Sequence, residues 1–148
     1  SKNYFGLTNH PVFTNEIHFN KYNHIIAICY LDKNNNEKWL PIIDKNGQPD
    51  FYIYGQNWVN WTFRVNQKYI NPKVLNNGIQ RYTAFWSRKN NISLKNAKFL
   101  IKVKKIDSPK NWEKDFLNKQ IAKPWIDGGY IEWKDNTFVS NIINIEKI

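Results

Sequence analysis

The chain has 148 residues, enough for one domain with a substantial hydrophobic core. Aromatic residues make up 16% of it, an apolar load that excludes a disordered chain despite the many Asn and Lys residues. The net charge of +10 is carried mostly by lysine, which favours solubility or attraction to anionic surfaces over specific phosphate recognition, for which arginine is better suited.

Apolar and alternating runs bounded by turn residues predict strands in the first half of the chain. The run 24–32 (HIIAICYLD) is apolar on both faces, which is typical of a central strand. Asn46-Gly47 is a strong hairpin signal. The strands expected before residue 70 are 10–19, 24–32, 37–44, 50–55 and 57–66.

A helix is predicted next, because apolar residues recur there at spacings of four, three and four. They are Leu75, Ile79, Tyr82 and Trp86. Asn71 suits the cap of this helix, and Pro72 suits its first position.

The last third returns to strands, interrupted by one short helix. Residues 97–106 (AKFLIKVKKI) alternate, so Phe99 is expected on the buried side. Ser108-Pro109 predicts the start of the second helix, with Trp112 and Phe116 inward. A final hairpin is expected from strands 128–133 and 137–145.

These elements predict a single globular domain over residues 1–148 of the α+β class. We expect a β-rich antiparallel sheet or open sandwich of about seven or eight strands with two short helices, since short connections favour antiparallel pairing. A pure β-sandwich with a helical insertion is the alternative. The chain contains no methionine, so we expect that it was excised from a longer chain.

No catalytic, metal or cofactor motif is present. His10, His18 and His24 cluster near the start but lack HxH or HExxH spacing, so we predict no metal site and no cofactor. Asp44 and Asp50 flank a hairpin turn, where Asp has a backbone role. We assign no catalytic residue, and the balance favours a protein that is not an enzyme.

Two surfaces are candidates for binding. In the strand 57–66 (NWVNWTFRVN), one face carries Trp58, Asn60 and Arg64, a flat ring beside amide and guanidinium donors that suits a polar ligand. A helix lying over that face would instead make Trp58 a second-layer core residue.

The second candidate is a row of lysines on one face of 97–106, formed by Lys98, Lys102 and Lys104. It extends about 20 Å at ~3.3 Å per residue and would suit an anionic membrane surface or a phosphate backbone. Only Leu100 is interleaved, without an aromatic residue for base stacking, which favours a solvated sheet face over a nucleic-acid site.

Several phrases, including FGLTNHPVF, WLPIIDKNGQPDFYIYG and WEKDFLNKQIAKPWID, resemble a soluble domain attached to multi-spanning membrane proteins of AT-rich bacteria. The resemblance implies a non-catalytic, membrane-associated or extracytoplasmic domain that contacts other protein domains, a polar ligand or anionic headgroups. A basic nucleic-acid-binding module and a small carbohydrate-active or hydrolytic domain are the alternatives.

Overall fold

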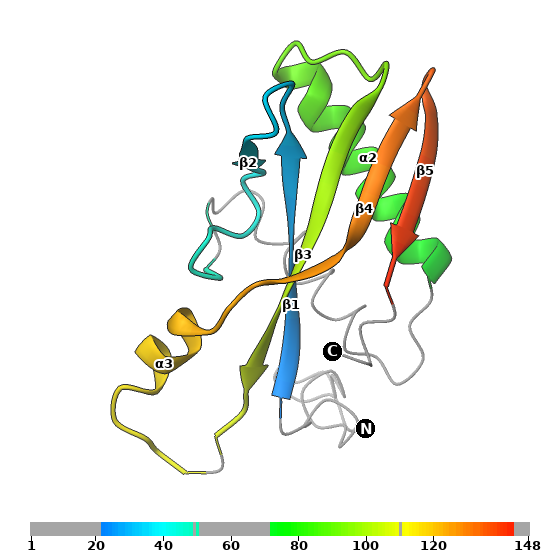
Figure 1. Ribbon diagram of the computed structural model, residues 1–148. Helices are drawn as coiled ribbons and strands as arrows, with labels where there is room; N and C mark the ends of the chain where they lie inside the picture. The colour runs from blue at the N-terminus through cyan, green and yellow to red at the C-terminus, as the bar shows by residue number, and fades with distance from the viewer. Residues whose placement is uncertain (1–21, 49, 51–71, 110, 144–148) are drawn as a thin grey trace, which may run out of the picture.

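The computed structural model describes residues 22–48, 50, 72–109 and 111–143. The elements in chain order are β1 (Tyr22–Leu31), β2 (Glu37–Trp39), α2 (Pro72–Lys89), β3 (Ala97–Asp107), α3 (Phe116–Ala122), β4 (Ile126–Lys134) and β5 (Thr137–Ile142). The strands form one open sheet in the order β2-β1-β3-β4-β5, and every neighbouring pair is antiparallel (Figure 1).

The α+β class is therefore confirmed, and the described residues form an open antiparallel sheet and two helices. The finer expectation of seven or eight strands included runs 10–19 and 57–66 and most of 50–55, which lie outside the described residues. The prediction that β1 is central is correct, because β1 lies between β2 and β3. Its ladder with β3 runs without interruption from Tyr22 opposite Asp107 to Leu31 opposite Lys98.

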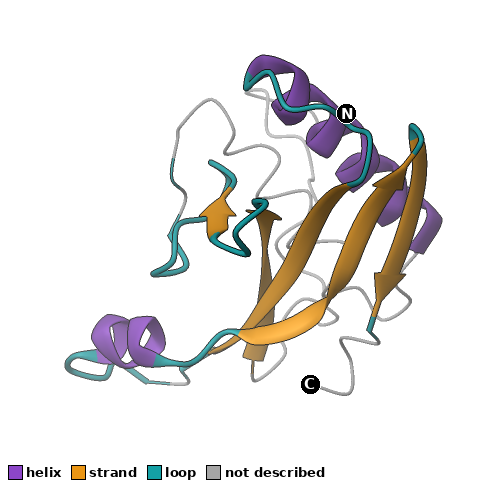
Figure 2. Ribbon diagram, turned by 45° about the horizontal axis from the view of Figure 1, so that its top comes forward, coloured by secondary structure: helices purple, strands orange, loops and turns teal. Residues whose placement is uncertain are grey.

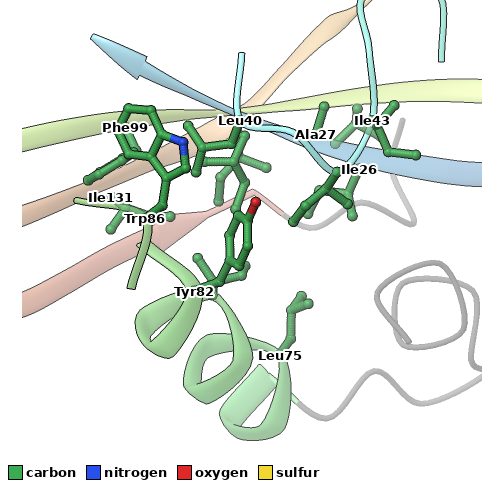
Figure 3. Close-up of a cluster of buried hydrophobic side chains, with 14 of the residues drawn as sticks. Ile26, Ala27, Leu40, Ile43, Leu75, Tyr82, Trp86, Phe99 and Ile131 are labelled. Carbon is green, nitrogen blue, oxygen red and sulfur yellow. The ribbon is translucent and has the colours of Figure 1, made fainter. Parts of the chain in front are cut away.

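Helix α2 crosses one face of the sheet, and its predicted apolar side forms the core there (Figures 1 and 2). Trp86 is buried and lies beside Phe99 (Figure 3). The ring centre of Trp86 is 6.2 Å from that of Phe99 and 5.5 Å from that of Tyr30. Trp133 donates its indole N–H to the hydroxyl of Thr83, a 3.2 Å contact that links β4 to α2. Apolar packing and this buried hydrogen bond thus help to hold the helix on the sheet.

On the opposite face, the turn at Asn46-Gly47 packs against β1. The nitrogen of Gly47 donates to the oxygen of Asp44 at 2.9 Å, so the turn of the predicted hairpin is present and Asp44 has the expected backbone role. The strand expected over 37–44 is shorter than predicted, because β2 ends at Trp39 and residues 41–42 form a turn. Gly47 has a φ of +88°, and a Cβ there would lie 2.8 Å from Cδ1 of Ile25. Trp125 fixes this turn by donating its indole N–H to the oxygen of Lys45 at 2.7 Å.

The prediction for the second helix is wrong at its start and in one core residue. Helix α3 begins at Phe116, and Trp112 lies before it with 87% of its surface exposed. The reason is the left-handed backbone of Asp115, with a φ of 60°, which interrupts helical periodicity so that Trp112 and Phe116 do not share a helix face. Within α3 the buried residue is Gln120.

Candidate functional site

The three lysines of the predicted row all lie on the face of β3 opposite Phe99, but each has a different environment. Lys98 is exposed and pairs with Glu132, its cross-strand neighbour on β4, at 3.2 Å. Glu132 also pairs with Lys134 at 2.9 Å, and hydrogen bonds from these two lysines lower the pKa of its carboxyl group. Lys98 therefore has a counter-charge within the sheet.

Lys102 is half-buried and lies between two carboxylates from different strands. Its Nζ atom is 2.7 Å from Glu37 and 2.8 Å from Asp127. Burial opposes its charge, but the hydrogen bonds to Asp127 and Glu37 outweigh that effect and raise the pKa of Lys102. This ion-pair cluster neutralises the middle of the row.

Lys104 is fully buried, at 1% exposure. Its Nζ atom donates to the backbone oxygen of Ile121 at 2.9 Å and lies 4.9 Å from the ring centre of Trp125. Burial lowers the pKa of Lys104, and the charge of Asp44 partly offsets this. Binding of an anionic surface by the row stays a prediction, and Lys98 is the exposed member of the three.

The other predicted site, formed by Trp58, Asn60 and Arg64, lies outside the described residues. Its role in ligand binding therefore stays a prediction.

A different basic surface lies on α2, and the sequence analysis did not identify it. Residues 72–106 contain nine cations and no Asp or Glu. The nine are Lys73, Arg81, Arg88, Lys89, Lys95, Lys98, Lys102, Lys104 and Lys105. The absence of acidic residues from this run is the sequence feature from which a basic surface could have been predicted.

Four of these cations are exposed on the side of α2 that faces away from the sheet, and we call them the α2 basic face. They are Lys73, Arg81, Arg88 and Lys89. Phe85 lies among them, 42% exposed, four residues after Arg81. None of the ion pairs found between described residues involves Lys73, Arg81 or Arg88. The α2 basic face is thus more accessible to an external anion than the lysine row.

Among the described residues, the nucleophilic and metal-binding side chains do not converge. Burial raises the pKa of the Cys29 thiol to about 12, with a further contribution from Glu37. Burial, and then the charge of Lys105, lower the pKa of His24. In the part of the chain that the structure describes, no three His, Cys, Asp or Glu side chains are placed to hold a metal, and no helix is long and apolar enough to cross a membrane.

No family model, curated protein or solved structure matches this chain. The chemistry of the described residues therefore carries the functional argument. Exposed arginine and lysine side chains gathered on one helix face create a positive potential that attracts anions, and salt weakens that attraction. The α2 basic face is therefore suited to binding an anionic ligand or surface.

Proposed function

We propose that this chain is a non-catalytic, extramembrane or extracytoplasmic domain of a larger bacterial protein, and that it docks onto anionic headgroups through the α2 basic face. The observation that supports this most directly is the contrast between two sets of cations. Lys98 and Lys102 have carboxylate partners in the sheet. Arg81 and Arg88 are exposed on α2 without an ion pair to any described residue.

The expected affinity of the α2 basic face for anionic headgroups is modest. A lysine or arginine near an anionic leaflet contributes about 1 kcal/mol, and the attraction extends over about one Debye length, ~8 Å at physiological salt. The apolar side of α2 is buried against the sheet, so the helix would rest on the headgroups without inserting. Such an affinity suits a domain that the rest of its protein already holds close to the bilayer.

Nucleic acid is the rival ligand, and one residue favours it. Phe85 is partly exposed between Arg81 and Arg88, an arrangement in which a base could stack on the ring while the arginines contact phosphate. The two ligands are distinguished by what Phe85 contributes. Headgroup docking depends on the charges, whereas nucleic-acid binding would also depend on the ring.

Co-sedimentation with vesicles tests the proposal. We expect binding to phosphatidylcholine vesicles that contain phosphatidylserine, little binding to phosphatidylcholine alone, and a loss of binding as salt is raised. The double substitution Arg81→Gln, Arg88→Gln should weaken binding by about 2 kcal/mol, or ~30-fold. The matched control Lys33→Gln, Lys114→Gln removes two exposed charges elsewhere and should have a smaller effect.

Equal sedimentation with neutral and anionic vesicles would contradict the proposal. A mobility shift with RNA or DNA at low salt, abolished by Phe85→Ala, together with no preference for anionic vesicles, would assign the α2 basic face to nucleic acid instead.

A further inference from the structure

The two edges of the sheet differ in how they are protected against pairing with another strand. Strand β2 has only three residues, two of them charged, and Pro41 follows closely. Short length, charge and proline are the features by which edge strands avoid association. Strand β5, at the other edge, has six residues (TFVSNI) with no charge and no proline.

The hairpin between β4 and β5 determines which backbone groups of β5 point outward. Its two-residue loop, Asp135-Asn136, has positive φ values of 47° and 65°, the geometry of a type I′ turn. Lys134 and Thr137 therefore form the hydrogen-bonded pair that flanks the loop. Just after β5, the backbone nitrogen of Ile143 donates to the backbone oxygen of Gly128 at 2.9 Å. Thr137 and Ile143 both bond toward β4, so the odd-numbered residues of β5 are the ones whose backbone groups bond to β4.

Because bonding direction alternates along a strand, the even-numbered residues of β5 direct their N–H and C=O groups away from β4. They are Phe138, Ser140 and Ile142. β5 is the last strand of the sheet, with no described strand beyond it. A row of outward backbone groups on an uncharged edge is a template for one more strand.

We propose that β5 pairs with β5 of a second copy of this chain, antiparallel and about a two-fold axis at Ser140. The strand is self-complementary in this register. Phe138 lies opposite Ile142 of the other copy on the α2 face, Val139 lies opposite Asn141, and Ser140 faces its own equivalent. No like charges meet, and each outward N–H gains an acceptor, as a two-fold interface requires. The two five-stranded sheets become one continuous sheet.

Sedimentation equilibrium over a range of protein concentrations tests this pairing. The wild type should dimerise reversibly. Ser140→Pro removes one outward N–H without breaking the ladder to β4, so it should abolish dimerisation while the circular dichroism spectrum is kept. Ser140→Ala keeps that N–H and should dimerise as the wild type does. A monomeric wild type, or a dimer that persists in Ser140→Pro, would overturn the proposal.

A cross-linking variant keeps the proposal testable if Ser140→Pro lowers stability. Directly opposed residues in a hydrogen-bonded pair have Cα atoms about 5.5 Å apart, within the range of a disulfide. Ser140→Cys should therefore form an intermolecular disulfide under a mild oxidant, whereas Lys33→Cys, exposed on a turn, should not. Cys29 does not compete because it is fully buried. Equal cross-linking of the two variants would count against the register.

Discussion

The Nζ atom of Lys104 lies 2.9 Å from the backbone oxygen of Ile121, and this contact ties β3, the middle strand of the sheet, to the end of α3. Alternation along β3 places Lys104 in line with Lys98 and Lys102, but its charge points into the molecule beside the ring of Trp125. The ammonium group therefore helps to attach the connection between β3 and β4, and it is not available to an external anion.

Replacing Lys104 by Met should change how stability depends on pH. Burial lowers the pKa of Lys104 below its ordinary value of 10.5, so the unfolded chain holds this proton more tightly than the folded chain. Relative to Lys104→Met, the free energy of unfolding of the wild type should rise as pH increases from below the folded pKa to about 10.5, and then level off. Urea titrations of both proteins across alkaline pH measure this difference. Parallel curves would show that Lys104 is hydrated in solution.

The tryptophans on α2 and before α3 should differ strongly in their effect on stability. Trp86 is 4% exposed and packs on Phe99, so Trp86→Ala should lower the free energy of unfolding by about 3–5 kcal/mol. Trp112 is 87% exposed, so Trp112→Ala should change it by less than about 0.5 kcal/mol. Denaturant midpoints measured side by side give the comparison. A large loss in Trp112→Ala would mean that this ring is covered in solution.

The hydroxyl group of Thr83 should contribute more to the free energy of unfolding than its methyl group does. It accepts from the indole of Trp133 and donates to the oxygen of Ile79 at 2.9 Å, and Thr83 is fully buried. Thr83→Val keeps the shape but leaves the buried indole N–H without an acceptor, which costs about 1–3 kcal/mol. Thr83→Ser keeps the hydroxyl and loses one methyl group, worth about 0.8 kcal/mol.

Thermal or urea unfolding should therefore place Thr83→Ser above Thr83→Val in stability, although valine is the more apolar residue. A valine variant as stable as the wild type would show that the contact with Trp133 contributes nothing.

Local patterns in the sequence were sufficient for the elements that depend on spacing or on turn chemistry. The apolar spacing of Leu75, Ile79, Tyr82 and Trp86 predicted the buried side of α2, and Asn46-Gly47 predicted a turn. The expectation for Trp112 failed because it assumed a continuous helix from Ser108, and the left-handed backbone of Asp115 leaves no periodic signal.

The environment of the lysine row could not be predicted, because its partners come from other strands. Lys102 meets Glu37 and Asp127, which are 65 and 25 residues away in sequence, and only the registers of four strands, β2, β1, β3 and β4, bring them together. The α2 basic face was accessible to sequence reasoning through its lack of acidic residues. Apolar spacing, which predicted the helix, marks only its buried side and therefore did not point to this face.

The central ladder between β1 and β3 also affects how the chain reaches its native state. β1 ends at Leu31, but β3, with which it forms its longer ladder, does not begin until Ala97. A pairing across so large a gap in sequence slows folding, since a long loop must close before its contacts form. During synthesis, the isoleucine-rich β1 leaves the ribosome well before its partner does. The apolar side chains on both faces of β1 then remain exposed to chaperones and to other nascent chains until residue 107 has emerged.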